Sequence, residues 1–227
     1  MRKNCKLIIG GDSAFAEIAY EYFTHDSAYE VVAFTVESEY LKRETLFGLP
    51  VVPFETLEKI YSPAEHRVYA AMVYTQLNRL RTRMSLQAKA KGYNLASYVS
   101  SRAFVWSNVE IGEHCFIFED NTVQPFVKLG NNIVLWSGNH IGHHSKIGDH
   151  CFVSSHVVVS GFCDIGPNCF LGVNATIGNN VTLGADSFLG AGAVVVKDVP
   201  ADTLVRGNLS DLSKPLSARR FSKVPSE

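Results

Sequence analysis

The amino-acid sequence predicts an α/β domain over residues 1–96 and an all-β domain over residues 97–203, followed by a C-terminal tail over residues 204–227. Two observations predict this organisation. In the first part, short apolar runs alternate with segments of helical hydrophobic spacing, which is typical of a parallel sheet with connecting helices. In the second part, every sixth residue from Val99 to Val195 is Val, Ile or Leu. A repeat of fixed period indicates a solenoid.

The α/β part is expected to be Rossmann-like. Its first strand runs into Gly10-Gly11, and a helix follows with Asp12 or Ser13 as N-cap and apolar residues through Phe23. Further elements are expected at residues 30–36 (strand), 55–61 (helix), 67–73 (strand), 76–91 (helix) and 93–99 (strand).

The turn after the first strand is a candidate substrate site. A helix that begins behind two glycines can bind a phosphate through its free N–H groups, so Gly10, Gly11, Asp12 and Ser13 are assigned to substrate binding. The complete G-x-G-x-x-G dinucleotide motif is absent. An ordinary tight turn between strand and helix is the alternative explanation.

The six-residue repeat predicts a triangular coil. The repeated aliphatic residue and a small or β-branched residue four positions later face a narrow interior. The residue three positions after the aliphatic is mostly Asn, Asp, Gly or His, which tolerate a positive φ and can turn a corner. Three units make a coil of 18 residues, and stacked coils form parallel ladders. Four of the five cysteines take the small interior position: Cys115, Cys151, Cys163 and Cys169.

Composition excludes several functions. Lys plus Arg number 21 against 22 Asp plus Glu, without a basic block, so we expect neither a nucleic-acid nor a membrane partner. No apolar run reaches a bilayer span, and residues 1–6 lack the apolar core of a signal peptide, which favours the cytoplasm. Five cysteines without a CxxC pair argue against a disulfide framework and a zinc ribbon.

The repeat resembles that of the hexapeptide-repeat acyltransferases, which implies a left-handed parallel β-helix. With the α/β part in front, the chain is similar to bacterial acetyltransferases of the sialic-acid O-acetyltransferase type, which include N-acetyltransferases of nucleotide-linked amino sugars. The resemblance implies acetyl-CoA as co-substrate, a nucleotide-linked sugar held by the α/β domain, and no metal. It also implies a homotrimer with active sites between adjacent β-helices, and a role in surface-glycan biosynthesis such as that of lipopolysaccharide O-antigen.

His143 is the candidate general base. Four other histidines occupy the corner position, where backbone preference accounts for them: His114, His144, His150 and His156. His143 lies two positions after Ile141, where no corner requires imidazole. The segment over residues 141–148 matches the family stretch that carries the base, and an imidazole can accept the proton of an attacking amine.

The resemblance implies further site residues around His143. Gly161, one coil later, matches the glycine whose amide contacts the thioester carbonyl, with a glycine required beside a corner as the alternative. His144 replaces the usual carboxylate and can orient the base only through a hydrogen bond. Asn139 and His140 are candidate sugar contacts, with an interior Asn ladder as the alternative for Asn139.

The later coils hold the candidate acetyl-CoA contacts. Val173 and Ala191 match family positions that line the CoA site. Lys197 and Arg206 are candidate contacts to its phosphates, with solvated charges as the alternative. Glycines after the aliphatic residue leave a shallow lane for the pantetheine arm, unless the repeat itself requires them.

The expected function is acetyl-CoA-dependent acetylation of the amine of a nucleotide-activated sugar by direct transfer. A sugar O-acetyltransferase of the sialic-acid type and a non-catalytic trimeric nucleotide-sugar-binding scaffold are the alternatives. A metal enzyme of the γ-carbonic-anhydrase kind is a further one, because His114 and His150 lie two coils apart. However, position 155, where a third ligand is needed, is Ser.

Overall fold

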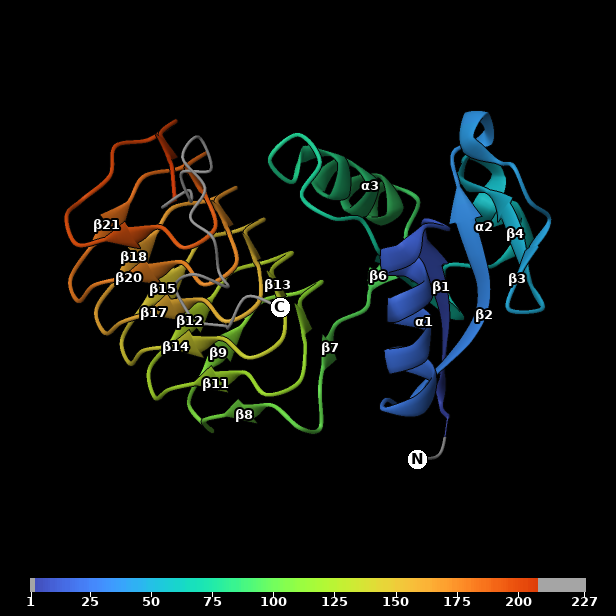
Figure 1. Cartoon of the computed structure of the whole chain (residues 1–227). Helices are drawn as coiled ribbons and strands as arrows, with labels where there is room; N and C mark the ends of the chain where they lie inside the picture. Colours follow the sequence, from blue (N-terminus) through green and yellow to red (C-terminus); the bar gives the residue numbers. More distant parts are fainter. Residues whose placement is uncertain (1–2, 208–227) are drawn as a thin grey trace, which may run out of the picture.

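The computed structural model describes residues 3–207. The α/β domain contains one sheet of strand order β3-β4-β2-β1-β5-β6, parallel except for the β3–β4 hairpin. In Figure 1, the helix α1 (Ala14–His25) lies between this sheet and the β-helix. The strands are β1 (Cys5–Gly10), β2 (Tyr29–Val36), β3 (Thr45–Leu46), β4 (Leu49–Pro53), β5 (His66–Ala70) and β6 (Asn94–Leu95).

Helices cover both faces of this sheet. On one face, α1 (Ala14–His25) packs on Leu7 and Ile9, while Ile8 points to the other face, against α2 (Leu57–Ile60) and α3 (Arg79–Ala90). Two short 3₁₀ turns complete the domain, η1 (Ser38–Tyr40) and η2 (Phe54–Thr56). Side chains that alternate between two covered faces are typical of a parallel sheet, and the predicted Rossmann-like class is confirmed.

Two predicted boundaries are wrong. The third helix begins at Arg79 and not at residue 76, because Gln76, Leu77 and Asn78 have φ of 54°, 47° and 68°, which no right-handed helix allows. The strand predicted over residues 93–99 is two short strands in different sheets. Its first half pairs with β5, and its second half, β7 (Tyr98–Val99), already belongs to the first coil of the β-helix.

The second domain is a left-handed parallel β-helix with three faces. Face 1 consists of β7, β10 (Phe116–Ile117), β13 (Val134–Leu135), β16 (Phe152–Val153), β19 (Phe170–Leu171), β22 (Phe188–Leu189) and β24 (Leu204–Val205). Face 2 consists of β8 (Phe104–Val105), β11 (Thr122–Val123), β14 (His140–Ile141), β17 (Val158–Val159), β20 (Thr176–Ile177) and β23 (Val194–Val195). Face 3 consists of β9 (Glu110–Ile111), β12 (Lys128–Leu129), β15 (Lys146–Ile147), β18 (Asp164–Ile165) and β21 (Thr182–Leu183).

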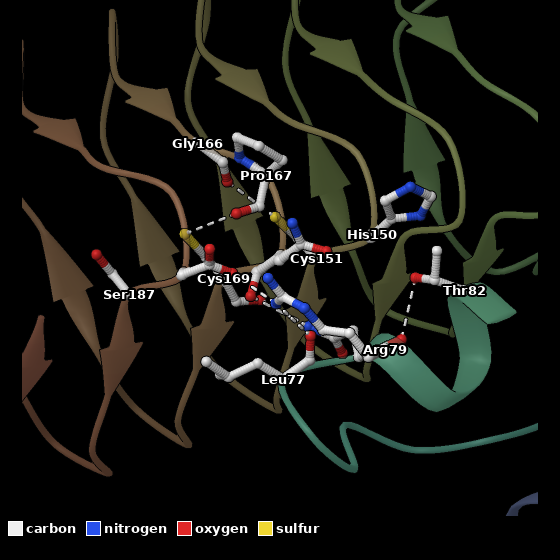
Figure 2. A network of polar contacts seen from close by, with 12 residues as sticks. Leu77, Arg79, Thr82, His150, Cys151, Gly166, Pro167, Cys169 and Ser187 are labelled. Atoms are coloured by element: carbon white, nitrogen blue, oxygen red, sulfur yellow. Dashed lines mark hydrogen bonds and ion pairs between the residues drawn. The ribbon is translucent and has the colours of Figure 1, made fainter. Parts of the chain in front are cut away.

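The interior of the coils follows the predicted columns. The aliphatic residues and the small residues four positions later form one buried cluster, which includes the four repeat cysteines as free thiols. The Cys151 thiol donates to the carbonyl of Gly166 at 3.2 Å, an interior contact that Figure 2 shows in place. The cysteines therefore fill the core, as predicted.

The corners also follow the prediction. Every corner residue from His114 to Asn180, at six-residue intervals, has a positive φ. Phe126 and Phe162 are corner residues too, although bulky side chains are uncommon in this conformation.

The three faces differ in chemistry. Face 1 carries aromatic side chains that pack on α1, including Phe116 and Phe118. The outward residues of the face 2 strands carry no charge, and Val158 and Val194 are exposed apolar residues there. Face 3 presents Glu110, Lys128, Lys146 and Asp164 instead. Within residues 3–207, no helix is long and apolar enough to cross a membrane.

A polar seam joins α3 to the corner between faces 3 and 1. Arg81 is fully buried and donates to Asn132 Oδ1 (2.9 Å) and to the carbonyls of Met72 (3.3 Å), Val73 (3.2 Å) and Cys151 (3.3 Å). Figure 2 shows this end of α3, with Arg79 and Thr82, against the coils that carry Cys151 and Cys169. The seam ties the loop after β5 to the β-helix.

Candidate active site

His143 lies at the corner between faces 2 and 3, directly after β14. Its backbone N–H donates to Oε1 of Gln124 at 2.9 Å, one coil earlier. Its ring lies over Gly161 of the next coil, where a Cβ would be 2.8 Å from Cε1 and 3.0 Å from Nε2. The glycine is therefore required for the ring to occupy this place, and stacking of Gly161 on His143 is as predicted.

His144 contacts His143 through its ring. The two Nδ1 atoms lie 3.2 Å apart, a distance at which one nitrogen carries the proton and the other accepts it. His144 is itself stacked between two corner residues, Phe126 at 4.6 Å and Phe162 at 4.8 Å between ring centroids. The aromatic pair was missed from the sequence, although both residues break the corner pattern and could have been noticed for that reason.

The predicted donor at Gly161 is already engaged. Its backbone N–H donates to Oδ1 of Asn179, one coil later, at 3.0 Å. The amide is thus paired within the coil stack, and in this structure Gly161 serves to make room for His143. The assignment of Gly161 to thioester binding needs correction to this extent.

Asn139 does not face a substrate. It is buried inside the coil, where its Nδ2 donates to the Trp136 carbonyl at 2.5 Å and its Oδ1 accepts the N–H of Val157 at 2.7 Å. The assignment of Asn139 as a sugar contact is therefore wrong, because its side chain is interior, as the alternative had it, and is bonded to backbone groups there. His140 lies on face 2, between Thr122 and Val158 of the neighbouring coils.

The candidate acetyl-CoA residues fall on two different edges of face 2. Lys197 stacks in the column of His143 and Gly161, at the corner with face 3. Val173, Ala191 and Arg206 follow face 1 strands and lie at the corner with face 1. All four are exposed, but within one chain the two groups are separated by the width of a face.

The predicted pantetheine lane has a simpler explanation. A Cβ at Gly172 would lie 2.7 Å from the backbone nitrogen of Ala191, so close stacking of coils requires the glycine. The same closeness recurs at Gly130 and Gly166 on face 3, where no lane was predicted. Close stacking of the later coils therefore accounts for Gly172, whereas earlier coils carry Phe118, Trp136 and Ser154 at the same position.

A cavity of about 420 Å³ opens at the carboxyl ends of the α/β strands. Gly11, Asp12 and Ser13, the residues assigned to substrate binding, line it together with Ala71 after β5. The N–H of Gly11 itself donates to the Thr35 carbonyl at 2.7 Å. Gly10 lies directly beneath, buried in β1. Because β1 stands between β2 and β5, the cavity occupies the point where the strand order reverses, which is where open α/β sheets bind ligands.

The basic side chains at this cavity were not singled out from the sequence. Lys42 and Arg43 follow η1 and line the cavity, and Nε of Arg43 lies 3.4 Å from Oδ2 of Asp12. Glu37 ends β2 but forms a two-pronged ion pair with Arg83, which lowers the pKa of Glu37. The adjacent basic pair after a strand was the available signal, since two cations beside a helix N-terminus favour an anionic ligand.

The cavity and His143 lie on different sides of the chain. The α/β domain covers face 1, whereas His143 occupies the corner opposite face 1, between faces 2 and 3. Figure 1 shows β14 and β15 on the side of the coils away from the α/β sheet. One chain therefore does not bring its candidate nucleotide site to its candidate base.

The histidines of the metal alternative are used otherwise. His114 accepts the Ala70 N–H at Nε2 (2.9 Å), and its Nδ1 lies 2.8 Å from Asn132 Oδ1, so neither nitrogen is available to a metal. Between residues 3 and 207, no group of three or more His, Cys, Asp or Glu side chains is placed to hold a metal ion.

The repeat of the β-helix matches a known family model. A family model described as bacterial transferase hexapeptide (six repeats) matches residues 126–161 and 162–197. Together with the three-faced coil, this match confirms the predicted hexapeptide repeat of the second domain.

Solved structures of similar fold include PerB from Caulobacter crescentus in complex with CoA and GDP-perosamine. It is 25% identical, with a TM-score of 0.80 over 89% of this chain and 94% of that chain. A mutant of perosamine N-acetyltransferase from the same organism, with the same ligands, is 24% identical, with a TM-score of 0.79 over 89% and 93%. The acetyltransferase domain of PglB from Neisseria gonorrhoeae, in complex with acetyl coenzyme A, is 23% identical, with a TM-score of 0.80 over 90% and 97%. No curated protein matches the sequence.

Proposed function

We propose that the protein transfers the acetyl group of acetyl-CoA to the amine of a nucleotide-linked amino sugar. The observation that carries the proposal is His143, whose ring is held over Gly161 at an outer corner of the β-helix. Among the described residues its Nε2 has no hydrogen-bond partner, so this nitrogen is free to meet a substrate. The similarity to PerB, solved with CoA and GDP-perosamine, supports the two substrates.

The chemical role of the protein in this reaction is to move a proton. Acetyl-CoA, when bound, supplies an acetyl group activated as a thioester. The Nε2 of His143 accepts the proton that the amine loses on attacking the thioester carbonyl. His143 then returns this proton to the departing sulfur, so that an amide and a thiol are formed and the imidazole is neutral again.

The cavity of the α/β domain is the proposed nucleotide site. Its N–H groups at the start of α1 and the cations Lys42 and Arg43 suit a nucleoside diphosphate. Val173, Ala191, Lys197 and Arg206 are the proposed acetyl-CoA contacts on the two edges of face 2. His140, on face 2 before His143, remains a proposed sugar contact.

The separation of the cavity from His143 within one chain supports a homotrimer with shared sites. The uncharged face 2, with Val158 and Val194 exposed, is the surface we expect to meet a second copy. Such packing brings the edge of face 2 that carries His143 against another copy, so that residues of two chains can form one site. We place the reaction in the cytoplasm, in bacterial surface-glycan synthesis.

A substrate screen tests the proposed function. Thermal shift against UDP-, dTDP-, GDP- and CMP-linked amino sugars should identify one stabilising nucleotide, and thiol release from acetyl-CoA should then depend on that sugar. Mass spectrometry should show an amide on the product. Acetylation of a hydroxyl instead would favour the O-acetyltransferase, and absence of acetyl-CoA binding by calorimetry would favour the non-catalytic scaffold.

Replacing the base is the direct test of His143. We expect His143→Ala to lower kcat by about 10²–10⁴-fold, the usual contribution of a positioned general base, with little change in the thermal midpoint. His156→Asn is the matched control, because it changes a histidine at another corner for a residue that turns four of the other corners. If His143→Ala retains nearly full activity, another group serves as base.

A further inference from the structure

Two corner residues around His144 depart from the rule that shapes every other corner. Corners from residue 114 to residue 192 all have a positive φ, and only Phe126 and Phe162 among them are not Asn, Asp, Gly or His. Their φ values are 67° and 59°, and each is 55% exposed to solvent. An exposed Phe in the left-handed region gains little from burial and costs backbone energy, so folding alone does not explain it.

Both phenylalanines stack on His144. They lie one coil before and one coil after it, with interplanar angles of 29° and 18° and centroid distances of 4.6 and 4.8 Å. Phe162 also meets the His143 ring edge-on at 5.1 Å. The His144 ring is thereby held in one plane, and in that plane its Nδ1 reaches the Nδ1 of His143 at 3.2 Å.

The hydrogen bond between the rings decides which nitrogens carry protons. If His143 is to accept a proton at Nε2, its own Nδ1 must carry the hydrogen and donate it. The Nδ1 of His144 must then be the acceptor, which leaves the hydrogen of neutral His144 on Nε2. A His144 ring free to turn would lose this contact, and the base would be free to adopt the other tautomer.

We propose that Phe126 and Phe162 are positioning residues of the base, which hold His144 as the neutral acceptor of the His143 Nδ1–H. The proposal rests on the proposed function for the role of His143 only. When Nε2 of His143 takes the amine proton, the pair gains one positive charge and its Nδ1–H bond becomes charge-assisted. Charge that spreads to His144 lies between two aromatic faces, which attract cations. The aromatic sandwich thus takes the place of an orienting carboxylate.

Replacing each Phe by Asn, a common corner residue, distinguishes a role in positioning the base from a role in folding. Phe126→Asn and Phe162→Asn relieve the backbone, so we expect an equal or higher thermal midpoint. We nevertheless expect kcat to fall by about tenfold in each, with KM for the nucleotide sugar unchanged, because misplacing a catalytic group lowers the rate. Phe162→Trp, which keeps an aromatic face, should restore most of kcat.

Phe47→Asn is the matched control. Phe47 has a φ of 50° and is 48% exposed, but it stacks on Tyr20 in the α/β domain and not on a histidine. The same substitution there should leave kcat unchanged. Loss of activity equal to that of Phe162→Asn would overturn the proposal, because it would reflect a general effect of removing an exposed Phe.

A measurement without substrate tests the positioning role independently of the proposed acetyl transfer. Imidazole ¹⁵N spectra of the full-length protein should show His143 protonated at Nδ1 and His144 at Nε2, and the Phe126→Asn/Phe162→Asn double variant should show mixed tautomers. Unchanged tautomers in that variant would sink the proposal. If the Asn variants dissociate the oligomer and keep the tautomers, the phenylalanines are subunit contacts and the proposal is also wrong. Failure to find acetyl transfer would leave the spectra unaffected.

Discussion

His114 shows how a residue placed by its backbone acquires a second role through its side chain. It turns a corner with a φ of 58°, as its position in the repeat predicts. Its ring is buried at the domain seam, stacked on Tyr69 at 4.6 Å, near Arg81 and His150. Burial lowers the pKa of His114 to about 3, so the folded protein holds it neutral.

This neutral histidine predicts a loss of stability in mild acid. Unfolded His114 titrates near its ordinary value of 6.5, so between pH 6.5 and about 3 the unfolded state binds the additional proton. The free energy of unfolding should therefore fall by about 1.4 kcal/mol per pH unit as the pH drops below 6.5. Burial lowers the pKa of His150 as well and adds to the effect. Urea unfolding at pH 7, 6 and 5 measures the slope, and His114→Asn should reduce it; identical slopes would contradict this assignment.

Gly161 leaves the space that the His143 ring occupies, so its replacement should affect kcat. A Cβ there meets the His143 ring at 2.8 Å, so Gly161→Ala should displace the imidazole and lower kcat by about 10²-fold. The thermal midpoint should hardly change, because the ring is at the surface. Gly178→Ala is the control, since a Cβ at Gly178 meets nothing closer than 3.5 Å. Equal activity of both variants would mean that the ring can move without loss.

At the scale of elements, α3 is the part that joins the two domains. Its start is set by tertiary contacts: Asn78 has a left-handed φ and donates to the Cys169 carbonyl at 3.3 Å, and Arg81 enters the seam one turn later. None of the described residues offers Arg81 a carboxylate partner, and burial lowers the pKa of Arg81 to about 10. Backbone carbonyls and an amide oxygen bind the guanidinium instead, so the seam depends on complete hydrogen bonding.

Removal of this cation should weaken the joint. Arg81→Met leaves the carbonyls of Met72 and Val73 without their donor, and we expect a loss of about 3 kcal/mol in the free energy of unfolding. Calorimetry should resolve separate transitions for the two domains. Arg79→Met, on the same helix, removes an ion pair with Asp186 and a hydrogen bond to the Leu77 carbonyl. Because the Arg79 side chain is 45% exposed, this variant should cost about 0.5 kcal/mol. A similar cost for both variants would show that the seam tolerates the loss.

At the scale of the whole molecule, the separation of the cavity from His143 predicts that two inactive variants can complement each other in mixed oligomers. His143→Ala lacks the base, and Lys42→Glu/Arg43→Glu should lack the nucleotide site, so each alone should be inactive. If one site draws on two chains, co-expression of the two variants should restore about a quarter of the sites. Activity of mixed, tag-purified oligomers measures this. No activity in the mixture would place both halves of the site on one chain and contradict the shared arrangement.

Much of the fold could be predicted because it depends on local rules. A six-residue period, a small interior and a positive φ at corners are properties of single residues and their neighbours, and the structure follows them from His114 to Val195. The boundary error at residue 76 lies where the loop after β5 contacts the β-helix, and the error at residues 93–99 lies where the chain passes into it. There, contacts such as that of Asn78 with the Cys169 carbonyl override local helix preference.

The candidate site was only partly predictable. His143 could be singled out because no corner rule called for it, and Gly161 because it lies one coil later. For Asn139 the sequence left a sugar contact and an interior position open, and the structure decides for the interior, where the amide is bonded through both Nδ2 and Oδ1. The stacking of Phe126 and Phe162 on His144 could not be inferred, since it depends on the rotamers of three side chains in adjacent coils.

The sequence by itself determined the two-domain class, the triangular coil, its cysteine-filled interior and the corner that carries His143, because each follows from periodic spacing along the chain. Only the tertiary structure decided that the α/β domain covers face 1, that its cavity faces away from His143, and that Arg81 joins the domains. These depend on which surfaces fit and which buried polar groups find partners, and neither is written in the period of the repeat.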